Sequence, residues 1–194
     1  MAPDLGTALP ALSSRSVVMI GLMGAGKSSV GRRLAARLGL PFFDADAEIE
    51  AAAGRSVTDL FAHYGEAAFR DGERRVMARL LHGPQAVIAT GGGAFVDADT
   101  RALIAARAIS IWLRADLDTL VKRTAGRDHR PLLQAGDRRD ILATLMQQRY
   151  PIYGAADLVV DSLDQPTDLT VQTVLRALVL HQQAPHDLAS PLEA

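Results

Sequence analysis

The amino-acid sequence predicts an α/β fold in which helices cover both faces of a parallel sheet. Short apolar runs alternate with longer segments whose apolar residues recur with the period of a helix, a pattern typical of consecutive βα units. The apolar runs are nearly continuous, as expected of strands that are buried on both faces. We therefore expect a three-layer α/β/α arrangement.

The predicted elements follow one another in regular order. Strands are expected at 17–20, 41–43, 86–89, 109–113 and 158–160. Helices are expected at 27–39, 45–53, 57–82, 97–106, 116–125, 138–150 and 167–181. Breaks are expected near Gly54 and Gly65, because glycine readily leaves helical backbone angles.

Length and composition favour one soluble folded unit. The chain has 194 residues, of which 48% are hydrophobic, enough for a sizeable core. We assign the unit to residues 16–181 and expect flexible tails at 1–15 and 182–194. A formal net charge of −1 offers no overall attraction to nucleic acid or to an anionic membrane. With no cysteine, no signal peptide and no apolar run of membrane-spanning length, we expect a soluble, cytoplasmic protein. We expect it to be a monomer.

A glycine-rich loop joins the first predicted strand to the first predicted helix. Residues 21–29 read GLMGAGKSS and satisfy the pattern G-x-x-x-x-G-K-[ST], whose backbone N–H groups bind phosphate oxygens at a helix N-terminus. Lys27 would reach the β- and γ-phosphates of ATP, and Ser28 would coordinate Mg²⁺. The alternative is a glycine turn that matches by chance, which the order of strand, loop and helix disfavours.

Two aspartates follow the second predicted strand at the carboxyl end of the sheet, where open α/β sheets bind ligands. Asp44 and Asp46 would point to the same side if the segment were extended. One carboxylate could hold Mg²⁺, and the other could accept a proton from a hydroxyl group. A different interpretation of Asp46 is that it only caps the helix at 45–53.

Two further motifs are less specific. Arg70 and Glu73 share a helix face, and the pattern alone favours a solvated ion pair. Residues 91–93 are three consecutive glycines after a strand, which a closely approaching ligand explains better than an ordinary turn does. No acidic residue ends that strand, which shifts the expected metal role toward Asp44.

The stretch AGRDHRPLLQAGDRR at 125–139 combines basic residues, two glycines and a proline. Such a composition cannot bury a core, and we expect a mobile basic loop there. Along the chain, this loop comes after the phosphate loop and after the D-x-D, F-R-x-x-E and GGGA motifs. A late arginine on a predicted helix follows it.

This ordered set of motifs resembles the shikimate kinase family over nearly all of residues 16–180. The resemblance implies a P-loop kinase fold like that of the nucleoside monophosphate kinases, with a five-stranded parallel sheet in the order 2-3-1-4-5 and a lid that closes over ATP. It further implies a transferase that moves the γ-phosphoryl group of ATP to the 3-hydroxyl of shikimate, a step of chorismate and aromatic amino acid biosynthesis.

The resemblance also implies roles for individual residues. The ATP phosphates would be bound by Gly24, Ala25, Gly26, Lys27, Ser28 and Ser29. Arg130 would move onto the transferring phosphate and Arg123 would lie along the adenine, while Ser28 and Asp44 hold Mg²⁺. Shikimate would be bound by Asp46, Arg70, Gly91, Gly92, Gly93 and Arg149. Lys27, Asp46 and Arg130 would be catalytic, with Asp46 as the candidate base.

The chemistry of shikimate fits this distribution, since one carboxylate and three hydroxyls call for arginines at one end and an acceptor at the other. Without the family pattern, Arg149 would be interpreted as a surface charge and Arg130 as part of a flexible loop. One departure is at 163–166, where many relatives carry an ATP-contacting arginine and this chain has Leu-Asp-Gln-Pro. The remaining alternatives are another small-molecule kinase, such as a gluconate kinase, and a nucleotide-binding module without catalysis.

Overall fold

The computed structural model describes residues 14–125 and 136–183. Five strands pair in parallel in the order β2-β3-β1-β4-β5. The strands are β1 (Ser16–Ile20), β2 (Phe42–Asp44), β3 (Val87–Ala89), β4 (Ala108–Arg114) and β5 (Leu158–Asp161). This order confirms the expected topology and brings the carboxyl ends of all five strands to one edge of the sheet.

The central strand β1 lies entirely in the core. Its residue Val17 pairs with Val87 of β3 on one side and with Ile109 of β4 on the other. All five β1 residues are buried, and the three β3 residues are buried as well. The nearly continuous apolar runs in the sequence follow from this burial on both faces.

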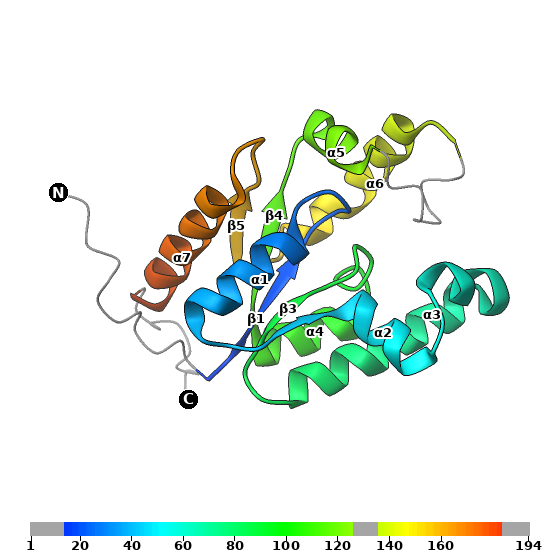
Figure 1. Ribbon diagram of the computed structural model, residues 1–194, viewed down its shortest axis with the longest axis horizontal. Helices are drawn as coiled ribbons and strands as arrows, with labels where there is room; N and C mark the ends of the chain where they lie inside the picture. The colour runs from blue at the N-terminus through cyan, green and yellow to red at the C-terminus, as the bar shows by residue number, and fades with distance from the viewer. Residues whose placement is uncertain (1–13, 126–135, 184–194) are drawn as a thin grey trace, which may run out of the picture.

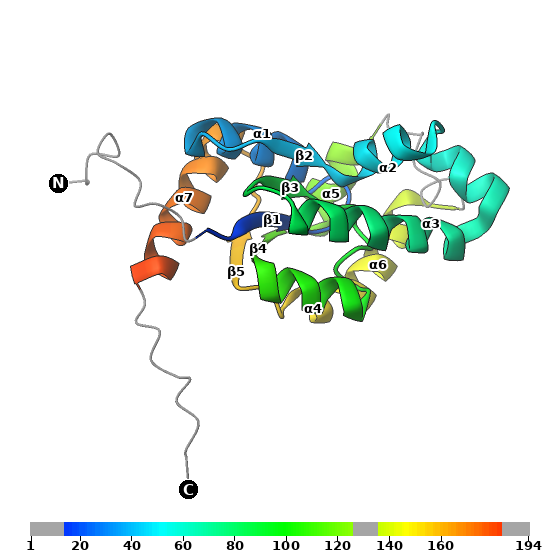
Figure 2. The same ribbon diagram turned by 90° about the horizontal axis from the view of Figure 1, so that it is seen from below.

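Seven helices surround the sheet in the described part of the chain. They are α1 (Lys27–Leu38), α2 (Ala45–Ala53), α3 (Val57–His82), α4 (Ala98–Arg107), α5 (Leu117–Thr124), α6 (Arg138–Tyr153) and α7 (Thr167–Gln183). Helices α1 and α7 lie on one face of the sheet, and α4 and α6 lie on the other, as Figures 1 and 2 show. The expected three layers are therefore present.

Helices α2 and α3 extend from the sheet edge that β2 forms (Figure 1). The expected break at Gly54 is the end of α2, where Gly54 takes left-handed backbone angles. The expected break at Gly65 lies inside α3, where its φ of 77° and ψ of 174° are not helical. The N-terminal part of α3 thereby changes direction relative to the rest.

One predicted helix end is wrong. Helix α6 does not stop at residue 150 but continues through Pro151 to Tyr153. Tyr150 and Tyr153 both pack edge-on against Trp112 of β4, and this packing holds the last turn in place despite the proline. Within the described residues, no helix combines the length and the apolar character that crossing a membrane requires.

Candidate active site

The phosphate loop connects β1 to α1 at the carboxyl edge of the sheet. Gly24 has a φ of 83° and Gly26 a φ of 92°, values that residues with a Cβ atom rarely adopt. Gly26 is also the residue that immediately precedes α1. The loop therefore delivers its backbone directly to the positive end of the helix, which is the arrangement that binds phosphate.

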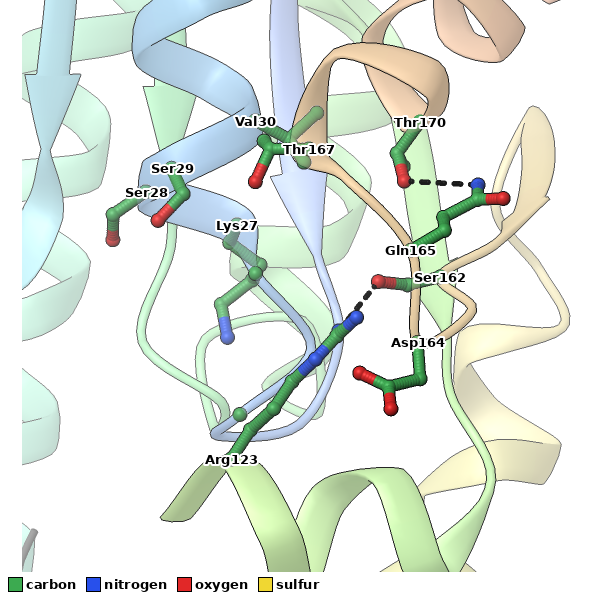
Figure 3. A pocket seen from close by; sticks show the side chains of 12 residues that line it. Lys27, Ser28, Ser29, Val30, Arg123, Ser162, Asp164, Gln165, Thr167 and Thr170 are labelled. Atoms are coloured by element: carbon green, nitrogen blue, oxygen red, sulfur yellow. Dashed lines mark hydrogen bonds between the residues drawn. The ribbon is translucent and has the colours of Figure 1, made fainter.

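A cavity of about 290 Å³ opens beside this loop, and we call it the donor cavity. Its lining combines the loop, Arg123 and the segment after β5 (Figure 3): Gly24, Gly26, Lys27, Ser28, Ser29, Val30, Arg123, Ser162, Asp164, Gln165, Thr167 and Thr170. The Nζ atom of Lys27 donates hydrogen bonds of 2.9 Å to the carbonyl oxygens of Gly21 and Leu22. The ammonium group is thus held at the loop.

Arg123 reaches across the donor cavity to the end of β5. Its Nη1 donates to Ser162 Oγ at 2.9 Å, as Figure 3 shows, and its Nη2 donates to the carbonyl oxygen of Leu163. Ser162 Oγ in turn donates to the carbonyl oxygen of Ala25 at 2.9 Å. Asp164 and Gln165 line the cavity in the segment where the family resemblance had implied an arginine.

Ser28 and Asp44 are the residues that fit a divalent cation. Ser28 Oγ donates to Asp44 Oδ2 at 2.6 Å, so two oxygen ligands from α1 and β2 meet at the edge of the phosphate loop. Mg²⁺ prefers such oxygen ligands together with phosphate oxygens and water. At the end of β3 stands Thr90, whose hydroxyl donates to the carbonyl oxygen of Met19 at 3.1 Å, so that position supplies no carboxylate.

A second cavity, of about 410 Å³, adjoins the first at Ser28, and we call it the acceptor cavity. Its lining comes from segments far apart in the sequence: Met23, Ser28, Asp44, Asp46, Ala47, Glu50, Ser56, Val57, Thr58, Phe61, Phe69, Arg70, Glu73, Gly91, Gly92, Gly93 and Arg149. Because Ser28 lines both cavities, a phosphate in one would lie next to a ligand in the other.

The sequence interpretation of the two aspartates needs one correction. Asp44 is the N-cap of α2, and its Oδ1 accepts from the backbone N–H of Asp46 at 3.2 Å. The capping role considered for Asp46 therefore belongs to Asp44. Asp46 is not part of an extended segment either, because it lies in the first turn of α2. Both side chains nevertheless line the acceptor cavity.

The pair formed by Arg70 and Glu73 is not the solvated pair that the pattern alone favoured. Arg70 Nη1 lies 2.7 Å from Glu73 Oε2, and the Glu73 side chain is only 3% exposed. Burial raises the pKa of Glu73, Arg70 opposes that shift, and the nearby Asp46 carboxylate adds to it. Glu73 Oε1 is buried and has no hydrogen-bond partner among the described residues.

The three glycines pack against functional side chains of the protein itself. A Cβ atom on Gly91 would lie 2.7 Å from Asp46 Oδ1 and 2.8 Å from Glu73 Oε1. A Cβ atom on Gly93 would lie 2.2 Å from Arg70 Nη1. The chain's own carboxylates and guanidinium groups therefore account for part of the need for glycine here, and close approach by a ligand stays a prediction.

Arg149 comes to the same place from α6. Its Nη1 donates to the carbonyl oxygen of Gly92 at 2.9 Å, so it is not the surface charge that the sequence alone would suggest. Tyr153 Oη donates to the same carbonyl oxygen. Successive glycines thus face Asp46 with Glu73, then Arg149, and then Arg70.

Sequence reasoning missed several residues that line the two cavities or support them. It gave no role to Ser162 and Gln165 of the donor cavity or to Tyr153, which contacts Gly92, and it treated Glu73 as a surface partner. A serine, a glutamine and a tyrosine carry no motif by themselves, and only their positions after β5 and near the end of α6 could have indicated them. Arg130 lies outside the described residues, as does most of the predicted basic loop at 125–139.

Comparisons with known proteins agree with this geometry. A family model described as shikimate kinase matches residues 23–179. The shikimate kinase of Paramagnetospirillum magneticum is 59% identical over 184 residues, covering 93% of this chain and 94% of the relative. The solved shikimate kinase from Acinetobacter baumannii in complex with shikimate gives a TM-score of 0.85 at 32% identity and covers 91% of this chain and 100% of that chain.

A gluconokinase from Sinorhizobium meliloti gives a TM-score of 0.57 at 21% identity and covers 89% of this chain and 98% of that chain. Such a likeness shows a shared fold and no more. The family model and the identity to the bacterial relatives are much stronger, and they apply to the segments that form both cavities. The chain therefore belongs to the shikimate kinase family.

Proposed function

We propose that this enzyme transfers the γ-phosphoryl group of ATP to the 3-hydroxyl of shikimate, giving shikimate 3-phosphate and ADP. One observation carries the proposal: Arg70 of α3, Arg149 of α6 and Asp46 of α2 meet around three glycines, next to the phosphate loop. Two guanidinium groups suit a carboxylate, and a carboxylate suits hydroxyl groups. Shikimate carries both kinds of group on one ring.

The donor cavity supports ATP as the phosphoryl donor. Lys27 and Arg123 both line this cavity. Lys27 would bind the β- and γ-phosphates together with the backbone of Gly24–Ser29, and Arg123 would lie along the base. Ser28 and Asp44 would hold Mg²⁺, which neutralises phosphate charge when it is bound. Asp46 lines the acceptor cavity and is the candidate base for the hydroxyl proton.

The assay that tests this function couples ADP release to a spectroscopic signal. Shikimate, gluconate and a reaction without acceptor are compared under the same conditions. We expect ADP release with shikimate alone. Release that is equal without any acceptor would indicate a simple ATPase, and release with gluconate but not with shikimate would overturn the proposed acceptor.

The carboxamide analogue of shikimate tests how the acceptor is bound. It leaves Arg70 and Arg149 facing a neutral amide, and the loss of one charge-assisted pair is worth about 2–5 kcal/mol on mutational scales. We expect a poor substrate. Arg149→Lys should weaken shikimate binding from the protein side with little change in ATP affinity, because an ammonium group cannot reproduce the planar fork. Weakened ATP binding with normal shikimate binding would contradict this placement.

A further inference from the structure

The carbonyl oxygen of Gly92 receives two hydrogen bonds from the end of α6. One comes from Arg149 Nη1 at 2.9 Å, and the other comes from Tyr153 Oη. Arg149 and Tyr153 are four residues apart and therefore lie on the same face of the helix. A single backbone oxygen thus connects a guanidinium group of the acceptor cavity to a phenol that does not line that cavity.

The ring of Tyr153 is fixed by its surroundings. The residue is 0% exposed, and its ring centroid lies 5.9 Å from that of Trp112, 6.2 Å from that of Tyr150 and 6.4 Å from that of Phe95. Burial raises the pKa of Tyr153 to about 12, so the hydroxyl group remains protonated and can donate. A donor held this rigidly can impose an orientation on its acceptor.

The two donors set the orientation of the peptide unit between Gly92 and Gly93. In a trans peptide the C=O and N–H bonds point in opposite directions, so a carbonyl drawn toward α6 directs the N–H of Gly93 away from α6. Among the described residues, the N–H groups of Gly92 and Gly93 have no hydrogen-bond acceptor. Both glycines line the acceptor cavity, and a ligand oxygen could therefore use these donors.

We propose that Tyr153 is a positioning residue for the acceptor: its hydroxyl fixes the Gly92 carbonyl, and through it both the Arg149 guanidinium and the backbone N–H of Gly93. The inference rests on the proposed function, since it assigns Tyr153 to the shikimate end of the same site. The competing explanation is that Tyr153 only fills the core and satisfies its own hydroxyl group. The two explanations differ in what removal of the hydroxyl does to shikimate binding.

Tyr153→Phe tests the proposal because it removes one donor and keeps the ring. Without the second donor, the Gly92 peptide and Arg149 lose their fixed orientation. We expect the KM for shikimate to rise about 3- to 10-fold, the range for one lost hydrogen bond. The KM for ATP should stay within about twofold, because the donor cavity shares no contact with Tyr153. The kcat at saturating shikimate should also change little.

Tyr150→Phe is the matched control. Tyr150 lies on the same helix and packs against the same Trp112, but its hydroxyl donates to the carbonyl oxygen of Ala115 and not to that of Gly92, which lines the acceptor cavity. It should lower the thermal midpoint about as much as Tyr153→Phe does and leave the KM for shikimate unchanged. A similar rise in shikimate KM in both variants would show a general effect on α6 and overturn the proposal.

The remaining outcomes separate the inference from the function on which it rests. A Tyr153→Phe enzyme with a lowered midpoint and an unchanged KM for shikimate overturns the positioning role alone. A wild-type enzyme that does not phosphorylate shikimate overturns the proposed function and the inference with it. If Tyr153→Phe does not fold, Tyr153→4-fluorophenylalanine, which keeps a substituent at the same ring position but cannot donate a hydrogen bond, replaces it. Shikimate and ATP affinities are then read from the fluorescence of Trp112, the only tryptophan; weaker shikimate affinity alone supports the proposal, and unchanged shikimate affinity overturns it.

Discussion

The donor and acceptor cavities are built in different ways. Six of the twelve residues that line the donor cavity come from one continuous stretch, Gly24–Val30. The acceptor cavity takes its polar groups from α1, the end of β2, α2, α3, the glycines after β3 and α6. A site contained mainly in one loop can be recognised as a motif, whereas a site assembled from many segments exists only when the sheet and helices are in place. The acceptor side should therefore depend more on supporting contacts.

The largest effect is expected at Lys27, within the donor cavity. Lys27→Met removes the charge that the loop holds toward the phosphates, and kcat should fall by about 10³-fold or more. Turnover and thermal midpoint are measured together. Lys122→Met provides the control, since Lys122 is the only other lysine and forms an exposed ion pair with Asp164. A Lys27→Met enzyme that is active, or inactive only because it is unfolded, would contradict the assignment.

Asp46→Asn should have the next largest effect. It keeps the size of the side chain and removes the candidate base, so kcat should fall by about 10²-fold. Because Asp44 and not Asp46 caps α2, the thermal midpoint should change little. Near-normal turnover in steady-state assays would show that Asp46 is not the base.

Asp44→Asn should act through the metal. Loss of one carboxylate beside Ser28 should weaken Mg²⁺ binding about 10- to 100-fold, and raising the Mg²⁺ concentration should restore much of the activity. Titration of turnover against Mg²⁺ measures this shift. An activity loss that no Mg²⁺ concentration relieves would place Asp44 in another role.

Glu73→Gln tests whether the acceptor cavity depends on supporting contacts, because Glu73 supports that cavity through its contact with Arg70. Losing a buried charged partner should raise the KM for shikimate about 10-fold. Glu66→Gln is the matched control: Glu66 also contacts Arg70, at 3.1 Å, but its side chain is 63% exposed, so its loss should change the KM by less than about twofold. Equal effects of the two substitutions would contradict a special role for the buried partner.

The burial of Glu73 beside Arg70 also predicts that the stability of the protein depends on pH. The pKa of Glu73 is raised above its usual 4.5 by burial, so the folded state binds the proton more tightly than the unfolded state. The stability that Glu73 contributes is then fully present below about pH 4.5 and is lost as the pH rises through the folded-state pKa. The thermal midpoint of the wild type, relative to that of Glu73→Gln, should therefore fall as the pH rises through the folded-state pKa of Glu73. A constant difference would mean that the pKa is not raised.

Much of the fold could be predicted because each element has a local signal. The bounds 45–53 and 57–82 agree with α2 and α3, where Gly54 ends one helix and Ser56 caps the next. The extra turn of α6 had no such signal, because Pro151 indicated an end and the contacts that oppose it come from Trp112 of another strand.

The residues of the candidate site also differ in whether a local sequence signal predicts them. Lys27 and Ser28 were predicted from the phosphate loop, because its motif consists of consecutive residues. Glu73 looked like a surface charge, because its close packing depends on a distant residue: a Cβ atom on Gly91 would lie 2.8 Å from Glu73 Oε1. Tyr153 could not be predicted at all, since its contact with Gly92 joins two residues that are 61 positions apart in the sequence. The roles given to Arg123, Arg70 and Arg149 remain predictions that the variants above can test.

The pairing of β1 has a consequence for how the chain folds. This strand is synthesised first, yet its two neighbours are Val87–Ala89 and Ala108–Trp112. Its hydrogen bonds cannot be completed until most of the chain has left the ribosome, and long-range parallel pairing of this kind is intrinsically slow. Until then, the apolar run Ser16–Ile20 is an exposed strand edge that can associate with other chains. Folding yield at high concentration should accordingly be limited by this central strand.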